Sequence, residues 1–450
     1  MTINENSITL INHASVLIKG PSKTILTDPW FDGDVFHHGW RLLYENETEQ
    51  IENILDETDY IWISHEHPDH FSIGFFKRYK NQILSNGIRI IFQKTEDGRV
   101  MDFLRKEGLP SIELASEERF DIEPGFIIKI IRDQYYDSAL VADLCGKIIF
   151  NLNDCPILSR ERIRDFQKRH GNCDVLLTQF SYAAWKGGRE NKNWRELAAS
   201  EKINGLVNQG NMFGAKVVIP FASFVWFSNE LNYYLNDSVN TPQKVLDHCS
   251  EGRASFDCLI LKPYEVYSMD AKPVQKREAI DFWEDRFKQL TRDKCGQYRQ
   301  TFNLDLLNDL FGQYCERIKR NNSWWIISLI GRLNFLGGFQ PVVIKLGDLG
   351  DTIIVDLPKQ VLCRTDKAPD VLLHSESLAF IFRNAFGFDT LTVNGTFEEV
   401  CHGGFGRFAK TFAIENLNNL GYSIKPALIF NLKLISIFLG RLTGVARKLK

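Results

Sequence analysis

The sequence lacks several features that mark common classes of protein. Its nine cysteines include no Cys-x-x-Cys pair and their number is odd, so neither a disulfide framework nor a structural zinc ribbon is expected. This cysteine usage indicates a reducing cytoplasm as the location. The chain contains no run of about 18 apolar residues, so no ordinary membrane-spanning helix is expected. Its first residues, MTINENSITL, lack a basic stretch followed by an apolar one, so no signal peptide is expected.

The chain also carries little excess charge of either sign. Its formal net charge is −3, so nothing in the overall composition indicates a nucleic-acid partner. The hydrophobic content of 44% and the charged content of 25% are typical of a soluble globular protein. A chain of 450 residues is too long for one ordinary domain, so two or three domains are expected.

Short apolar segments typical of β-strands form two clusters in the first part of the chain, with helical segments between them. One of these segments, Asp59–Ser64, runs directly into a histidine-rich stretch. Two sheets with helices on their outer faces are therefore expected. This is an α/β fold of the αββα sandwich type.

The sequence becomes polar and loses its periodicity at residues 267–276, which indicates a domain boundary. Helical segments and then strand-like segments follow, including an expected strand at Thr390–Asn394, so a smaller α+β domain is predicted. The predicted parts are a catalytic domain (residues 1–268), a helical connector (269–323), the α+β domain (324–424) and a basic amphipathic C-terminal helix (425–450).

The last predicted segment is apolar with basic residues interspersed. Such a helix could lie on a membrane surface or contact a partner. Lys433 and Arg441 interrupt the apolar run, so we favour a helix that docks on its own domain.

The run Ser64-His65-Glu66-His67-Pro68-Asp69-His70 is the most informative motif in the chain. Two imidazoles one residue apart, on a loop that leaves a buried strand, can converge on one metal ion, while Asp69 and His70 turn toward a second. Imidazole and carboxylate together suit zinc or iron. The alternative is a polar surface loop, but three of the chain's ten histidines fall within six positions, which favours a metal site.

A second acidic position, Asp154, follows an expected strand at Lys147–Leu152. A carboxylate at a strand end can bridge two metal ions about 3.5–4 Å apart. The alternative is an Asx turn after the strand.

Four motifs in order resemble the metallo-β-lactamase superfamily, in the branch of the metallo-β-lactamase-like domain of CMP-N-acetylneuraminate hydroxylase. They are TDPW (residues 27–30) with GWRLLYE (39–45), ISHEHPDHFS (63–72), NDC (153–155) and IPFA (219–222). The resemblance covers roughly residues 5–265 of the chain.

By this resemblance the metal ligands would be His65, His67, Asp69, His70 and Asp154. Asp69 and Asp154 would also act in catalysis. Asp28 would be an acid at the floor of the site. The resemblance places His13 near the metals as a further catalytic residue, and a hydrogen-bonded histidine at a strand end is the alternative.

The chain departs from the superfamily by having fewer imidazoles. No histidine occurs between His70 and His170, where the family usually supplies one, and the late histidine after a strand is also missing. The first of these gaps contains Asp133 and Asp137, and we expect Asp133 to be a metal ligand. Oxygen-rich dinuclear sites favour iron over zinc, so two iron ions are expected. One or two zinc ions, or a weakened one-metal site, are the alternatives.

The sialic-acid hydroxylase also carries a Rieske iron–sulfur module, which needs Cys-x-His and Cys-x-x-His pairs. This sequence has only the adjacent pairs His248-Cys249 and Cys401-His402, so the module is not expected in it. Electrons for an oxidation would then come from a separate electron-transfer protein.

The stretch Ser181–Glu190 contains glycines and basic residues near the expected site. Lys186 and Arg189 could bind an anionic group of a small-molecule substrate, with Trp185 beside them. The alternative is an ordinary solvated loop.

The stretches VVIKLGD…TIIVD, PDVLL…SLA and LTVNG resemble a sterol-carrier-protein-like domain over residues 324–402. Such domains can hold an apolar ligand between helix and sheet. A structural or homodimer-forming part is the alternative that we favour, because similarity of fold alone does not establish a ligand.

Three functions follow from these observations. The first is a di-iron oxygenase that hydroxylates a small polar metabolite derived from a sugar or an amino acid. The second is a zinc hydrolase of an ester, lactone or phosphodiester, in which bound metal lowers the pKa of water toward about 7. The third is a lipid- or partner-binding protein with a degenerate site. We favour the first because of the acidic character of the site and the resemblance.

Overall fold

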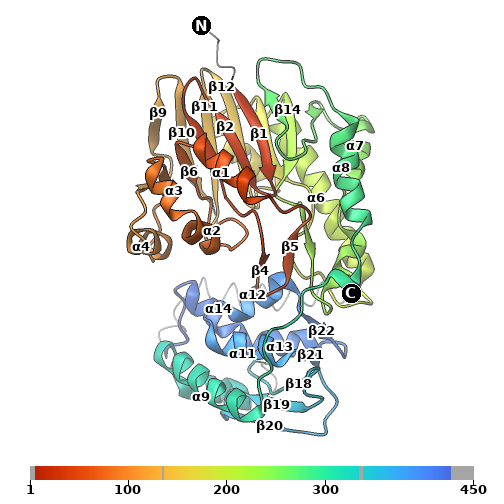
Figure 1. Ribbon diagram of the computed structural model, residues 1–450. Helices are drawn as coiled ribbons and strands as arrows, with labels where there is room; N and C mark the ends of the chain where they lie inside the picture. The colour runs from red at the N-terminus through yellow and green to blue at the C-terminus, as the bar shows by residue number, and fades with distance from the viewer. Residues whose placement is uncertain (1–5, 134–135, 334–337, 427–450) are drawn as a thin grey trace. The chain divides into compact units, whose positions relative to one another are not determined.

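The computed structural model describes residues 6–133, 136–333 and 338–426 (Figure 1). The chain forms two compact units, Met1–Gly296 and Gln297–Lys450. The predicted C-terminal helix at residues 425–450 lies outside the described residues, apart from its first two positions. Among the helices that the structure describes, none combines the length and apolar character needed to cross a lipid bilayer.

Within its described residues, the first unit forms two seven-stranded mixed sheets and a small third sheet. In spatial order the first sheet is β17 (Val266–Ser268), β1 (Ser7–Asn12), β2 (Ser15–Lys19), β3 (Thr24–Thr27), β6 (Tyr60–Trp62), β7 (Arg89–Gln93) and β8 (Ser111–Leu114). The second is β16 (Asp257–Cys258), β14 (Val217–Phe221), β13 (Val175–Gln179), β12 (Lys147–Asn153), β11 (Ser138–Leu144), β10 (Phe126–Arg132) and β9 (Arg119–Glu123). The third is β15 (Val225–Phe227), β5 (Trp40–Leu42) and β4 (Asp34–Val35).

Each large sheet is half antiparallel and half parallel. In the first, β3, β6, β7 and β8 run parallel, and in the second, β12, β13, β14 and β16 do so. The loops that leave the carboxyl ends of neighbouring parallel strands meet at one edge of a sheet, where ligand sites of α/β folds commonly lie.

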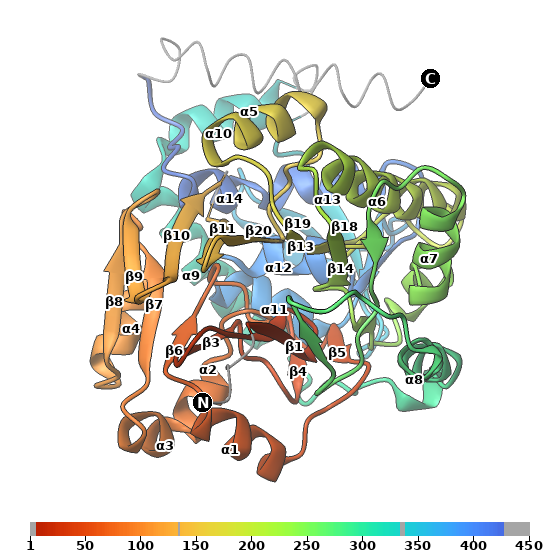
Figure 2. The same cartoon turned by 90° about the horizontal axis from the view of Figure 1, so that it is seen from above.

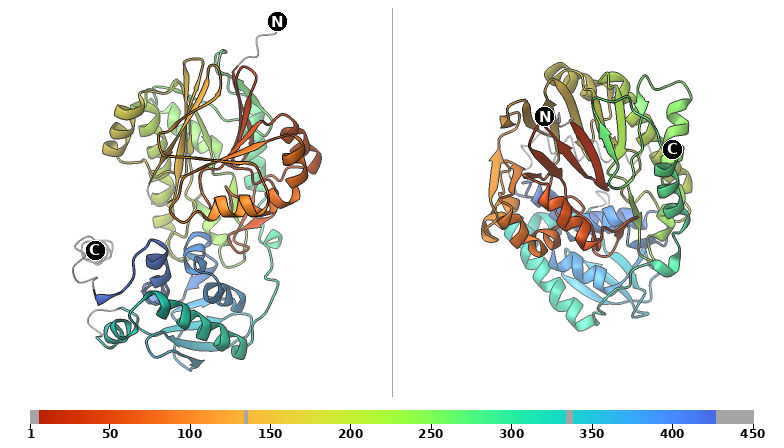
Figure 3. Two further views of the ribbon diagram at one scale, coloured as in Figure 1. Left: turned by 90° about the vertical axis from the view of Figure 1, so that its left-hand side faces the viewer. Right: turned by 45° about the horizontal axis from the view of Figure 1, so that its top comes forward.

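Helices of the first unit cover the outer faces of the two sheets (Figures 2 and 3). They are α1 (Thr48–Asp56), α2 (Ile73–Arg78), α3 (Lys80–Ser85) and α4 (Arg99–Lys106) beside the first sheet, and α5 (Arg160–His170) and α6 (Lys192–Met212) beside the second. Helices α7 (Pro242–Ser250) and α8 (Arg277–Lys288) lie along one side of the sandwich (Figure 2). Two short 3-10 helices occupy Tyr233–Ser238 and Arg292–Lys294. The predicted αββα sandwich is thereby confirmed.

The main core lies between the two sheets, and it follows from alternation along the strands. In β10, Phe126, Ile128 and Ile130 are fully buried, while Ile127 and Lys129 between them are not. These side chains pack with those of β1, β2, β11 and β12 in one apolar cluster. A second cluster joins the first sheet to α1–α4. In a strand such as β10, a slip of one residue would move the buried side chains to the less buried face, so this alternation fixes its register.

The division between the units comes at Gly296, later than the predicted boundary at residue 268. Helix α8 follows that predicted boundary but packs on the first unit. The indole of Trp283 is fully buried, stacks on Phe224 with ring centroids 3.9 Å apart, and donates a hydrogen bond of 2.8 Å to the carbonyl of Leu261. The polar stretch at residues 267–276 is therefore a connection within the first unit, because the helix that follows it still belongs to that unit.

The second unit has one five-stranded sheet and six helices among the described residues. In spatial order the sheet is β20 (Val361–Arg364), β19 (Thr352–Asp356), β18 (Val342–Leu346), β21 (Val371–Leu373) and β22 (Phe397–Glu399). The helices are α9 (Leu304–Asn321), α10 (Trp324–Arg332), α11 (Ser375–Arg383), α12 (Gly387–Asn394), α13 (Gly404–Phe412) and α14 (Ile414–Asn419). Helix α13 packs against β18 and β21, and α9 packs against α11. The resemblance to a sterol-carrier-protein-like domain stays a prediction.

The predicted strand at Thr390–Asn394 is wrong, because these residues end helix α12. The β-branched Thr390, Thr392 and Val393 favour a strand locally. Helical spacing instead buries Phe388, Leu391 and Asn394, and tertiary packing outweighs the local preference.

A pair of leucines on α6 tests the position of the core. Leu206 is fully buried in the main cluster, whereas Leu197 on the same helix is 57% exposed. We expect Leu206→Ala to lower the free energy of unfolding by about 2–5 kcal/mol. The control Leu197→Ala should change it by less than about 0.5 kcal/mol. Urea unfolding measures both, and equal losses would contradict this packing of α6.

Candidate metal centre

The candidate site lies where three strands of the first unit end. Asp28 follows β3, the loop of residues 64–70 begins soon after β6, and Asp154 follows β12. Because β3 and β6 are parallel neighbours, Asp28 and Ser64 emerge at the same edge of the first sheet. The end of β12 brings Asp154 from the second sheet to the same place.

The carboxylate of Asp28 holds these segments together. It accepts hydrogen bonds from the backbone N–H of Ser64 at 2.7 Å and from the Ser64 hydroxyl at 2.8 Å. It also contacts Nδ1 of His70 at 3.2 Å and accepts a hydrogen bond from the side-chain amide of Asn153. Asp28 and Asn153 both have left-handed backbone, with φ of 37° and 50°. One buried carboxylate thus fixes the loop of residues 64–70, the metal loop, and the start of the segment that carries Asp154.

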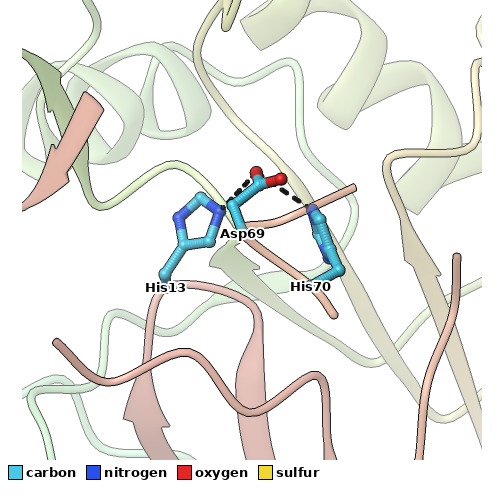
Figure 4. A group of neighbouring side chains, drawn as sticks. All are labelled: His13, Asp69 and His70. Carbon is cyan, nitrogen blue, oxygen red and sulfur yellow. Dashed lines mark ion pairs between the residues drawn. The ribbon is translucent and has the colours of Figure 1, made fainter. Parts of the chain in front are cut away.

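Imidazoles and carboxylates converge above Asp28. Nε2 of His70 lies 3.3 Å from Oδ2 of Asp69 and 3.5 Å from Oδ2 of Asp154. Nε2 of His13 lies 3.4 Å from the same Asp69 oxygen, so Asp69 stands between two rings (Figure 4). Nε2 of His65 is 2.9 Å from Nδ1 of His67. The structure therefore brings together His13 and all the histidines and aspartates of the motif, with Asp154.

Two overlapping groups in this cluster have ligand atoms close enough to hold an ion. They are His13, Asp69 and His70, and His65, His70 and Asp154, each with its atoms within 4.8 Å of one another. Nε2 of His70 and Oδ1 of Asp69 are buried and make no hydrogen bond of normal geometry within the described residues. Buried polar atoms without hydrogen bonds are costly, and a bound cation would satisfy them.

The carboxylates of Asp69 and Asp154 favour positive charge at the position of the His70 ring. Burial alone would lower the pKa of His70, but the carboxylates of Asp69 and Asp154 outweigh it and hold this pKa well above its ordinary value. Burial would raise the pKa of Asp69 and Asp154, but the charge of His70 outweighs it and holds both pKa values below the usual range. For His65, burial lowers the pKa to about 4, so its ring is neutral and its nitrogen can bind a metal.

The two aspartates of the histidine-free stretch have different surroundings. Asp133, the predicted ligand, forms an ion pair with Arg162 on α5. Asp137 instead approaches the cluster, with Oδ1 3.9 Å from Nε2 of His65. Burial, and next the charge of Asp154, raise the pKa of Asp137 to about 6. The carboxylate that faces the imidazoles is therefore that of Asp137.

The predicted substrate residues lie on the loop before α6. Nε1 of Trp185 donates a hydrogen bond of 3.1 Å to the hydroxyl of Tyr234, and the guanidinium of Arg189 lies 5.0 Å from the centre of the same ring. Lys186 is close enough to lower the pKa of Lys202. Trp185 and Arg189 therefore both contact Tyr234.

Two functional candidates carry no sequence motif. Gln179 is the last residue of β13, and its side-chain amide donates a hydrogen bond to Oδ1 of Asp154. Lys202 on α6 donates a hydrogen bond of 2.6 Å to Oε1 of Gln179. The only available indication in the sequence was the position of Gln179 at the carboxyl end of an apolar strand.

Comparison with known proteins gives this geometry a family context. Residues 7–129 match the family described as the beta-lactamase superfamily domain. The cytidine monophosphate-N-acetylneuraminic acid hydroxylase of Danio rerio is 23% identical over 253 residues, which are 52% of this chain and 41% of that protein. The inactive cytidine monophosphate-N-acetylneuraminic acid hydroxylase of Homo sapiens is 36% identical over 257 residues, 53% of this chain and 49% of that protein. The chain spans about half, or less, of these relatives.

Among solved structures, CmlA, a diiron beta-hydroxylase from Streptomyces venezuelae, has a TM-score of 0.41 and 13% identity, and covers 59% of this chain and 54% of its own. The resemblance inferred from the four motifs is confirmed by the family match and the hydroxylase relatives. Residues 7–129 match the beta-lactamase superfamily domain, and the αββα sandwich of the first unit is the fold that the four motifs predicted.

Proposed function

We propose that the first unit is a dinuclear metalloenzyme, a di-iron oxygenase that hydroxylates a small polar metabolite derived from a sugar or an amino acid. Its electrons come from a separate electron-transfer protein. The observation that supports this most is the convergence of His65, His70, Asp69 and Asp154, with buried ligand atoms that lack hydrogen bonds.

The donor set fits iron. Asp69, Asp154 and Asp137 supply three carboxylates to one cluster of imidazoles. Carboxylate-rich sites with imidazole favour iron over zinc. Iron bound there would supply the redox chemistry that hydroxylation requires. The hydroxylase relatives support this choice of reaction, although their substrate is a property of those proteins.

The residues of the chain have distinct roles in this proposal. His65, His67, His70, Asp69 and Asp154 hold the metals, and Asp137 takes the place that we predicted for Asp133. Asp28 orients His70 through Nδ1 and leaves Nε2 directed at the two carboxylates. A hydrogen-bonded partner of this kind fixes the tautomer of a ligand histidine. His13 contacts the same oxygen of Asp69 as His70 does, and so helps to hold that carboxylate in place.

A zinc hydrolase is the second candidate, and one contact favours it. His13 lies 3.4 Å from Asp69, so the cluster contains four histidines. A site rich in imidazole suits zinc and hydrolysis by metal-activated water. Stoichiometric zinc, with turnover of chromogenic lactone or phosphodiester substrates, would support this candidate against the oxygenase.

Metal content separates the candidates directly. We expect protein purified without added metal to contain two irons per chain by plasma mass spectrometry, with a Mössbauer spectrum of a coupled pair. His65→Ala should lose at least one of the two ions, because Nε2 of His65 faces the cluster. His248→Ala is the control, since His248 lies on α7 and contacts Asn204 and Glu251. Stoichiometric zinc, or no metal, would contradict the oxygenase.

Asp28→Asn tests the residue that orients His70. The amide cannot accept the same set of hydrogen bonds from Ser64, His70 and Asn153, so we expect metal affinity to fall by about 10–100-fold. Asp32→Asn, the same change at an exposed residue paired with Arg78, should leave affinity unchanged. Competition with a chelator measures both variants, and equal affinities would contradict the role of Asp28.

Asp137 gives a test of the electrostatics. In metal-free protein, carboxyl NMR should show Asp137 titrating at about 6. Asp154→Asn removes a neighbouring negative charge, so the pKa of Asp137 should fall toward its ordinary value. Asp121→Asn, at an exposed position on β9, is the control. A midpoint that does not move in Asp154→Asn would show that Asp137 does not face the cluster.

A further inference from the structure

Lys202 is a partly exposed lysine on α6 that reaches the edge of the candidate site. Its ammonium donates a hydrogen bond of 2.6 Å to Oε1 of Gln179. Among the residues that the structure describes, no carboxylate forms an ion pair with it. An ammonium has three N–H donors, so this neutral acceptor leaves most of its hydrogen-bonding capacity to a ligand or to water.

Gln179 connects Lys202 to the cluster in one defined orientation. Its Oε1 accepts from Lys202 and its Nε2 donates to Oδ1 of Asp154. The other oxygen of Asp154 lies 3.5 Å from Nε2 of His70. A single amide therefore separates the ammonium from a carboxylate of the site, and a group bound to Lys202 lies beside the reacting centre.

The surroundings of Lys202 carry charges of both signs. Burial lowers the pKa of Lys202, the charges of Asp154 and Asp137 raise it, and the charge of Lys186 lowers it. The ammonium is partly removed from water, and its one hydrogen-bond acceptor is a neutral amide. An anion would stabilise it through charge-assisted hydrogen bonds.

We propose that Lys202 binds a compact anionic group of the substrate, a carboxylate or a phosphate, beside Asp154. This inference rests on the proposed function, because it names the substrate class of the same site. It gives the site two ends of opposite charge: the carboxylate cluster holds cations, and Lys202 holds the anionic end of the ligand.

Orienting Gln179 is a competing role for Lys202. That role needs only one hydrogen-bond donor to Oε1, and it needs no positive charge. If Lys202 acted in this way, its loss would disturb Asp154 and with it the binding of metal. Anion binding and metal content therefore distinguish the two roles.

The test is calorimetric titration of inorganic phosphate and of acetate into the protein as purified with its metals. We expect one of these anions to bind, and Lys202→Met to weaken that binding by at least about tenfold, the loss of a charge-assisted hydrogen bond. Lys202→Arg, which keeps the charge, should bind within a few-fold of the original. Lys192→Met, the same substitution at an exposed position of α6, is the control. The tighter of the two anions identifies phosphate or carboxylate as the bound group.

The outcomes are separable from those of the proposed function. Binding that is equal in Lys202→Met and the original, or no binding of either anion, overturns the inference while metal content still supports the enzyme. Loss of metal in Lys202→Met also overturns it, in favour of orientation of Asp154. Lys202-dependent anion binding in a chain that contains no metal would support the anion site and contradict the oxygenase.

Discussion

The structure of the site depends on one buried carboxylate, that of Asp28. Its hydrogen bonds join the ends of three strands, through Ser64 after β6, His70 in the metal loop and Asn153 at the end of β12. Two of these strands belong to one sheet and the third to the other. The convergence of the ligands therefore depends on the packing of the two sheets, because any shift between the sheets would separate the partners of Asp28.

Charge is distributed unevenly around this constraint. Asp69, Asp154 and Asp137 face a group of imidazoles, and the carboxylates of Asp69 and Asp154 raise the pKa of His70 despite its burial. On the other side of Asp154 the amide of Gln179 leads to the ammonium of Lys202. Such an arrangement suits a ligand with a neutral reactive part and an anionic end, which would be oriented before any reaction.

The sequence predicted the sandwich and the metal loop because both depend on local patterns. Alternating apolar strands identify a sheet, and His65, His67, Asp69 and His70 occupy a short motif. Residues that join the site through long-range packing were missed, as with Lys202, which lies in the middle of a helix with no motif. The strand predicted at Thr390–Asn394 failed for the same reason, because burial of Leu391 outweighed local β preference.

Asn153 must satisfy two requirements at once, a left-handed backbone conformation and a side-chain hydrogen bond to Asp28. Its φ of 50° lies in the left-handed region. Glycine adopts this region without steric cost, whereas most other residues are strained there. Its amide also donates to Asp28, which glycine could not do. Asparagine is among the few residues that tolerate this backbone and carry a side-chain donor. Few residue types can therefore occupy position 153 in the turn that precedes Asp154, even though Asn153 is not one of the proposed metal ligands.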